Sequence, residues 1–437
     1  MVDLIYASLF GMIAGMLIGL LPGLGTTAFL ILCFPFLITQ SFIFCILFYC
    51  TASSISQYFG SVTTLTLGIP GENTSLPLLN IRAKIIAHNK LNEVYYLSAF
   101  GSLVASILSG VLIYFCLDFF STTIFYLKSY FSLIFALLGF LLCILYSDNK
   151  VLISAVLMIS GWCLGKIGYN EITNDSFLTF DNPYLYSGIP TLPAIMGLYA
   201  LPNLLLMFKK LKSKSTSLEL KLEKVNVITV SIAHAGTILR SSLTGFVSGL
   251  IPYIGNGISS NLAFNIERKI NPHNFVAHAA ASEAANNSAN LSVLIPLLLL
   301  GVAIVPSEYV LLEIISSGNK FINWASLSDS FLSIVFCLAV TNFLAFGISW
   351  NGIKIFNRVV ARIFNVVAVP LMIFVMVSIF LIGMEVNQGL FYLLTLLMFC
   401  ITGLCMQRFD LLPLVYAFLL QNNVEQIFYR FYQIYLA

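Results

Sequence analysis

The chain has 437 residues, of which 59% are hydrophobic and only 9% charged, and its mean hydropathy is +0.96. Soluble domains carry about 25% charged residues, so this composition excludes a soluble protein and indicates an integral membrane protein. The formal net charge of +3 is too small to indicate a nucleic-acid partner.

Long apolar segments predict an all-α membrane protein with ten to twelve crossings, some of them broken helices or hairpins. A crossing helix needs about 20 mainly apolar residues, and the ten-residue alternation of an outer-membrane barrel is missing. We therefore expect a multi-pass protein of a bacterial inner membrane, with its first span retained because the N-terminus lacks the features of a signal peptide. The predicted spans are 4–21, 26–57, 96–118, 122–146, 149–166, 184–208, 228–251, 288–305, 329–350, 364–383, 387–406 and 410–422.

One pattern of glycine and proline occurs twice in the chain. GMLIGLLPGLGTT begins at residue 15, and GFVSGLIPYIGNG begins 230 residues later, at residue 245. Matched apolar segments that are interrupted by Gly and Pro point to the binding site of a secondary transporter, because irregular backbone in lipid must be buried in protein or line a cavity. The alternative is that these glycines only allow helices to pack closely. The shared positions are Gly15, Gly19, Pro22 and Gly25, and Gly245, Gly249, Pro252 and Gly255.

A polar, lysine-rich segment divides the chain. Six lysines lie in or beside residues 209–226, and loops rich in Lys and Arg are retained on the cytoplasmic side. We predict a first membrane repeat at residues 1–208, a basic cytoplasmic linker at 209–226 and a second membrane repeat at 227–437. By analogy with related membrane folds, we expect the two homologous repeats to be inverted and to support alternating access.

The first repeat contains a segment that is too polar for a lipid-facing span. Residues 51–66 carry hydroxyl or amide groups on every face, and the segment then breaks at Gly68-Ile69-Pro70-Gly71. We interpret it as a helical hairpin or broken helix whose tip reaches the protein interior. Helix N-termini at such a tip suit a carboxylate, and carbonyl groups released by the break suit a sodium ion.

The second repeat contains a comparable segment, AHAAASEAANNSANLS, which leads into a long apolar run. Glu283, Asn287 and Asn290 are spaced i, i+4, i+7 and share one helix face. Such groups are expensive in lipid, so we expect them to face a cavity filled by water or ligand. The alternative is that interhelical hydrogen bonds satisfy them and hold the helices together.

Other chemistry has little support in the sequence. The nine cysteines all lie in apolar runs without CxxC spacing, so we assign them neither a disulfide nor a metal. The chain has no G-x-S-x-G motif, no P-loop and no dinucleotide fingerprint. We therefore expect a protein that is not an enzyme and has no cofactor apart from a coupling ion.

Several sequence blocks together resemble the TctA-type large membrane subunit of the tripartite tricarboxylate transporters. The chain departs from the family pattern at Phe59, Glu72 and Tyr253, and after Gly301 it lacks a second Ile-Pro-Gly. The blocks are LLPGLG (20–25), YFGSVTTLTLGIPGENTS (58–75), GYNEITNDSFLTFDNPYLYSGI (168–189), GLYALPNLL (197–205), GFVSGLIPYIG (245–255), SEAANNSANLSVLIPLLLLG (282–301) and RFDLLPLVYAFLLQNNVEQIF (408–428).

The resemblance implies a secondary active permease that imports a tricarboxylate or dicarboxylate on a sodium or proton gradient. It also implies two partners besides membrane lipid: a small four-helix membrane subunit, and an extracytoplasmic solute-binding protein that delivers the substrate. We predict Glu283 as the ion-coupling residue. The predicted substrate-binding residues are Gly23, Gly25, Thr26, Gly71, Asn73 and Thr74 from one half, and Gly255, Asn256, Ser259, Asn286, Asn287 and Asn290 from the other.

Three alternatives stay open at this point. One is a membrane-embedded enzyme that acts on a lipid-type substrate, with Glu283 and a histidine as its acid–base pair. The second is a passive channel, which would need neither an ion gradient nor a binding protein. The third is a degenerate membrane scaffold that does not transport, which the departures at Tyr253 and after Gly301 favour.

Overall fold

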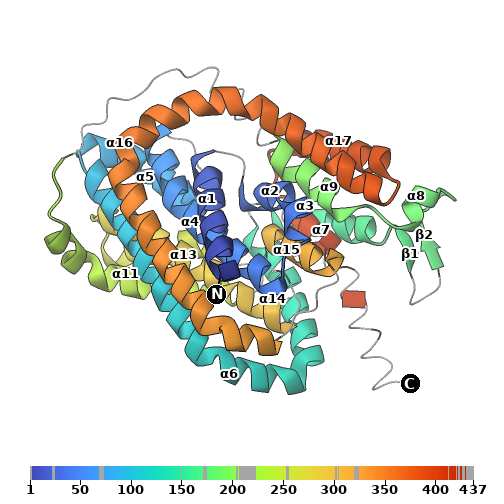
Figure 1. The fold of residues 1–437 in the computed structure, drawn as a ribbon, viewed down its shortest axis with the longest axis horizontal. Helices are drawn as coiled ribbons and strands as arrows, with labels where there is room; N and C mark the ends of the chain where they lie inside the picture. The colour runs from blue at the N-terminus through green and yellow to red at the C-terminus, as the bar shows by residue number, and fades with distance from the viewer. Residues whose placement is uncertain are drawn as a thin grey trace.

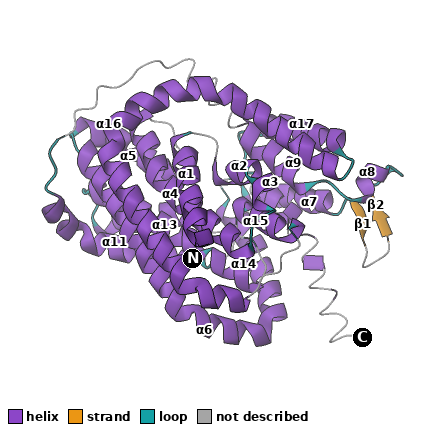
Figure 2. Ribbon diagram, viewed as in Figure 1, coloured by secondary structure: helices purple, strands orange, loops and turns teal. Residues whose placement is uncertain are grey.

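The fold is almost entirely helical (Figure 1). The strands among the described residues, β1 (Gly168–Asn170) and β2 (Asp175–Phe177), form one short antiparallel hairpin, which Figure 2 shows at the edge of the molecule. The computed structural model describes residues 2–21, 25–67, 73–147, 149–170, 175–202, 205, 223–251, 255–300, 303, 305–318, 324–411, 413–419, 421, 424–425 and 429.

The helices fall into two series separated by the linker. Most of the linker, and the tips at residues 22–24, 68–72 and 252–254, lie outside the described residues. The first series is α1 (Val2–Leu20), α2 (Gly25–Leu32), α3 (Phe34–Leu37), α4 (Phe42–Leu67), η1 (Asn73–Ser75), α5 (Leu76–Ala87), α6 (Leu91–Tyr146), α7 (Val151–Gly165), α8 (Pro183–Tyr186), α9 (Thr191–Ile195) and η2 (Met196–Ala200). The second is α11 (Val227–Gly249), α12 (Gly255–Ile270), α13 (Phe275–Ser292), α14 (Leu294–Leu300), α15 (Pro306–Ser317), α16 (Trp324–Glu385) and α17 (Gly389–Cys405).

Glycines hold the first helix of each series against a later one. A Cβ atom on Gly15 of α1 would lie 2.6 Å from the carbonyl oxygen of Ala52 in α4, and one on Gly245 of α11 would overlap the carbonyl oxygen of Ala285 in α13. Gly19 and Gly249 make equally close approaches one turn later. The packing alternative for the doubled glycines is therefore correct for these four positions. Because numbers rise together on both helices, α1 runs parallel to α4, and α11 parallel to α13.

At the centre of the molecule, α4 and α13 cross in opposite directions. The hydrogen bonds between them pair rising numbers on α4 with falling numbers on α13. The partners are Ser53 with Asn290, Ser54 with Asn287, Gln57 with Asn286 and Ser61 with Glu283. Helix α6 packs against α13, α16 packs against α4, and the two long helices also contact each other (Figure 1).

The span prediction is confirmed only in part. Four described helices are long and apolar enough to cross a membrane, namely Val2–Leu20, Phe42–Thr66, Leu91–Phe115 and Asp329–Gly352. The predicted span 26–57 is broken into α2, α3 and the start of α4. Two pairs of predicted spans, 96–118 with 122–146 and 329–350 with 364–383, lie in the single helices α6 and α16, of 56 and 62 residues. At about 1.5 Å per residue each is far longer than one crossing, and both curve around the body of the molecule (Figure 1).

Candidate functional site

The candidate site is built on α4 and α13, whose polar side chains are buried inside the protein. Every described side chain of α4 from Thr51 to Thr66 is buried, and so is every residue of α13 from Val276 to Ser292. Helix α13 is rich in Ala and Ser, and these small side chains let its neighbours approach closely enough to exclude solvent. The sequence thus places amides and a carboxylate in the protein interior, where each requires a hydrogen-bond partner.

One group of polar residues joins four helices. The Oγ of Ser54 in α4 lies 3.1 Å from the Asn287 Oδ1 of α13 and 2.9 Å from the Asn342 Oδ1 of α16. Ser106 of α6 completes the group, because its Oγ is 3.1 Å from the Ser54 Oγ and 3.3 Å from the Asn287 Oδ1. All four side chains are buried.

A second group connects this interface to the tip region before α5. The Gln57 Oε1 accepts hydrogen bonds from the Thr74 hydroxyl and from the Asn286 amide, both at 2.7 Å. One further turn along α4, the Ser61 hydroxyl donates to the Glu283 carboxylate at 2.6 Å. Thr74 and Glu283 therefore approach the same face of α4 although 209 residues separate them in sequence (283 − 74).

A third group connects the interface to the helix that follows the second Gly/Pro tip. Asn290 donates to the Ser53 hydroxyl at 2.9 Å and accepts from the Asn256 amide of α12 at 3.3 Å. Ser259 accepts a hydrogen bond from Ser248 at 2.7 Å, which ties α12 back to α11. The three groups together are called the central cluster below.

The described side chains of the central cluster are polar and include no fixed positive charge. Its groups are hydroxyls, amides and one carboxylate. Arg240 on α11 is engaged elsewhere, because it donates to the Glu267 carboxylate at 2.6 Å. Arg82 donates to the carbonyl oxygens of Leu65 and Thr66, where it caps the last turn of α4.

A known protein family matches almost the whole length of the chain. Residues 5–416 match the model of the family described as "Tripartite tricarboxylate transporter TctA family". The chain belongs to the TctA family. It is thus a multi-pass membrane protein. Because this is a family of transporters and not of enzymes, the prediction that the chain is not an enzyme is confirmed.

Comparison with individual proteins adds one curated relative. It is "Uncharacterized 52.8 kDa protein in TAR-I ttuC' 3'region" of Agrobacterium vitis, which is 25% identical over 308 residues, or 68% of this chain. The match covers 60% of that relative's length. No solved structure matches the chain.

The structure of this TctA chain brings seven predicted site residues into the central cluster: Thr74, Asn256, Ser259, Glu283, Asn286, Asn287 and Asn290. Gly25 and Gly255 begin α2 and α12 with φ of +58° and +47°, a conformation that favours glycine. Thr26 is half-buried in the first turn of α2. Gly23, Gly71 and the side chain of Asn73 lie outside the described residues.

The predicted site residues do not include the members of the cluster on α4, which lie in the polar segment 51–66, and they do not include Ser248, Ser106 or Asn342. Asn342 stands alone in the apolar stretch LAVTNFLAF, and an amide in such a place is a functional candidate by default. That signal was available in the sequence. Ser106 gave no comparable signal, because serine is common in the small-residue faces of membrane helices.

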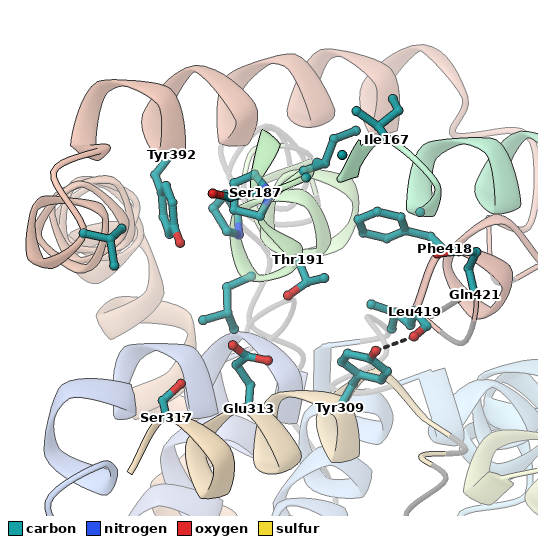
Figure 3. Close-up of a pocket in the computed structure, with 18 of the residues that line it drawn as sticks. Ile167, Ser187, Thr191, Tyr309, Glu313, Ser317, Tyr392, Phe418, Leu419 and Gln421 are labelled. Carbon is teal, nitrogen blue, oxygen red and sulfur yellow. Dashed lines mark hydrogen bonds between the residues drawn. The ribbon is translucent and has the colours of Figure 1, made fainter. Parts of the chain in front are cut away.

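A separate polar cavity lies between α9, α15, α17 and the β-hairpin, with a volume of about 720 Å³ (Figure 3). Glu313, Tyr309, Tyr392 and Thr191 point into it, and Tyr309 donates a hydrogen bond to the Leu419 carbonyl oxygen. Its one described ion pair joins Lys166 to Glu425 at 3.4 Å. Glu313 is a further carboxylate in this lining, and none of the predicted site residues is among the described residues that line the cavity.

Proposed function

We propose that the chain is a secondary active permease that imports a tricarboxylate or dicarboxylate, driven by a sodium or proton gradient. The observation that carries the proposal is the pair of amides at the crossing of α4 and α13. Among the described residues, the Asn286 Oδ1 and the Asn287 Nδ2 are buried and have no hydrogen-bond partner. Buried polar atoms nearly always have a hydrogen-bond partner, so we infer that a bound ligand is the partner of these two atoms.

The chemistry of the central cluster fits a carboxylate that travels with a cation. Amide N–H and hydroxyl groups donate to carboxylate oxygens, whereas Glu283 and the amide oxygens are the hard ligands that a sodium ion prefers. A cation bound beside Glu283 would also offset the repulsion between its carboxylate and the substrate. The existing hydrogen bonds are between neutral groups, apart from the bond to Glu283. A ligand can replace these bonds at small net cost.

We further propose that residues 1–208 and 227–437 are homologous, inverted repeats. Support comes from the recurrence of similar elements: the apolar helices Val151–Gly165 and Gly389–Cys405 begin 238 residues apart (389 − 151). The positive φ of Gly25 recurs at Gly255. The antiparallel crossing of α4 and α13 supports inversion, because these helices hold corresponding places in the two series.

The basic linker sets the proposed orientation, with the linker in the bacterial cytoplasm. The Asn92 amide donates to the Glu223 carbonyl oxygen at 2.5 Å, so the start of α6 lies on the linker side. The β-hairpin and α8 lie at the far end of the molecule from α11 in Figure 1, and we assign them to the extracytoplasmic side, where a binding protein would deliver substrate. The small membrane subunit and lipid would cover the exposed apolar faces of the outer helices.

Uptake of labelled citrate and other carboxylates into proteoliposomes tests the proposal. It is measured with and without a sodium or pH gradient, and with the binding protein and small subunit added. We expect gradient-driven uptake that needs the partners and that Glu283→Gln abolishes while the protein remains in the membrane. Flux that ignores the gradient would indicate a channel. No flux of any substrate through folded protein would favour the scaffold.

A further inference from the structure

A second fully buried carboxylate lies outside the central cluster, at the start of α15. Glu308 has no exposed surface, and its Oε2 accepts a hydrogen bond at 3.2 Å from the backbone N–H of Val305, the residue that caps this helix. Burial of an ionisable side chain away from water is costly, which makes Glu308 a functional candidate. The N-terminus of α15 favours a negative charge at this position.

Two further side-chain oxygen atoms are buried at the start of α15. The hydroxyl groups of Ser307, the residue before Glu308, and of Tyr49 lie 3.1 Å apart, so α15 is joined directly to α4. Both residues are buried. A carboxylate and two hydroxyls are hard oxygen ligands, the set that a sodium ion prefers.

The place of Glu308 relative to Glu283 suggests its role. Glu283 contacts α4 at Ser61, whereas the start of α15 contacts α4 at Tyr49. These positions are 12 residues apart, about 18 Å along the helix, and Ser54 and Gln57 lie between them. The two carboxylates therefore stand on opposite sides of the central cluster. Glu308 is on the side where α4 begins, opposite to the linker.

The start of α15 also contacts the second Gly/Pro hairpin. A Cβ atom on Gly255 would lie 2.9 Å from the Val305 Cγ1, and the next residue, Asn256, donates to Asn290 of the central cluster. A change in the occupancy of Glu308 can therefore be transmitted to the cluster through the first turn of α12. In the sequence, Val305-Pro306-Ser307-Glu308 also parallels Ile69-Pro70-Gly71-Glu72, and the latter four residues lie outside the described residues.

From this geometry we propose that Glu308, with Ser307 and Tyr49, forms a second binding position for the monovalent coupling cation, on the extracytoplasmic side of the central cluster and separate from the position beside Glu283. The inference rests on the proposed function in treating that cation as one that drives carboxylate import. The competing explanation is that Glu308 only caps α15. Glutamine keeps that cap, because its amide oxygen accepts the same hydrogen bond, but it loses the charge.

Direct cation binding provides the first test. Thermal unfolding of the purified chain is compared in sodium chloride and choline chloride, and at pH 6 and pH 8. A cation that binds only the folded protein raises Tm, so we expect wild type to show a rise that is smaller in Glu308→Gln, where only the position beside Glu283 is left. Glu313→Gln, on the same helix but facing the separate cavity, should keep the wild-type rise. A shift in sodium alone identifies sodium, and one between pH values alone identifies a proton.

The transport readout separates the proposal from the proposed function. In proteoliposomes, Glu308→Gln should lose gradient-driven uptake by about tenfold or more while substrate exchange continues, since exchange moves no net cation. Tyr49→Phe and Ser307→Ala should raise the half-saturating cation concentration if the cation is sodium, even if Glu308→Gln fails to assemble. An unchanged cation dependence in all three variants would overturn the proposal. If wild type binds the cation through Glu308 but takes up no carboxylate, only the proposed function is overturned.

Discussion

At the scale of single residues, the amides of the central cluster determine what the site can hold. Asn287 is the member that contacts three elements, because its side chain bonds Ser54 of α4 and Ser106 of α6 while belonging to α13. Its Nδ2 atom has no partner among the described residues. One amide thus combines a structural contact with a donor that a ligand carboxylate can accept.

Replacing Asn287 should therefore impair transport more than folding. We expect Asn287→Ala to reduce the rate of carboxylate uptake by about tenfold to a hundredfold, the equivalent of one or two hydrogen bonds to a charged ligand. Asn261→Ala is the matched control, because within the described part of the chain Asn261 on α12 donates only to the Gly257 carbonyl oxygen of its own helix. The proteoliposome assay, normalised to protein in the membrane, measures both. Equal uptake by the two variants would remove Asn287 from the site.

The ion pair between Arg240 and Glu267 belongs to the framework of the site. Glu267 is fully buried and accepts hydrogen bonds from Thr237, Arg240 and Asn271. These hydrogen bonds join the middle of α11 to the last turn of α12 and so fix the position of the two helices, the second of which carries Asn256.

Loss of Arg240 should destabilise the protein. Arg240→Met leaves the Glu267 carboxylate buried without its cation, which costs about 1–2 kcal/mol once the partial exposure of the arginine is allowed for. Thermal unfolding in detergent should show a lower Tm, and Arg240→Lys should recover part of the loss. The double variant with Glu267→Gln should be more stable than Arg240→Met alone. A double variant that is the less stable of the two would mean that the ion pair is not the source of the effect.

At the scale of helices, glycines decide which elements can touch. Gly245 faces α13 so closely that a methyl group would overlap its backbone, whereas a Cβ atom on Gly236, earlier on the same helix, would meet nothing within 4 Å. Both glycines are helical, but only Gly245 packs closely against another helix. A comparison of the two positions therefore separates the effect of helix propensity on stability from the effect of packing.

Substitution of these glycines by alanine should have effects of opposite sign. Gly245→Ala should destabilise by about 1–3 kcal/mol, because α11 and α13 must move apart. Gly236→Ala should stabilise by up to about 1 kcal/mol through better helix propensity. The Tm values in detergent, together with the yield of chain in the membrane, report both changes. If Gly245→Ala is as stable as wild type, the close packing of α11 on α13 is wrong.

Part of this architecture could be predicted from the sequence. The doubled Gly/Pro pattern located both helix breaks, and the polar face of residues 283–290 located the part of the central cluster that α13 contributes. These features are local, because a glycine that must allow close approach and an amide in an apolar run are visible without knowing the partner. The i, i+4, i+7 spacing of Glu283, Asn287 and Asn290 survives as one face of α13 against α4.

The remainder depends on contacts between distant segments. Nothing local in the sequence marks Ser106 as the residue that faces Asn287, since that pairing depends on how α6 crosses α13. The continuity of α6 and α16 was also missed. Hydropathy shows where a helix is apolar, but it does not show whether two apolar stretches are joined by a helix or by a loop.

At the scale of the whole molecule, the direction of the helices carries the proposal of inverted repeats. Helix α1 runs parallel to α4, α11 runs parallel to α13, and α4 runs antiparallel to α13. The start of α1 must therefore lie on the opposite side of the molecule from the start of α11, which follows the basic linker. This relation depends only on contacts within the bundle and not on the number of crossings.

Labelling of single introduced cysteines in intact cells with a membrane-impermeant maleimide tests this relation. We expect Asp3→Cys, at the start of α1, and Ser176→Cys, on the β-hairpin, to react from outside. Lys224→Cys, just before α11, should react only after the membrane is permeabilised. The unsubstituted chain gives the background from its native cysteines. Reaction of Asp3→Cys and Lys224→Cys from the same side would require α1 and α11 to be parallel. It would then contradict the antiparallel crossing of α4 and α13 on which the central cluster is built.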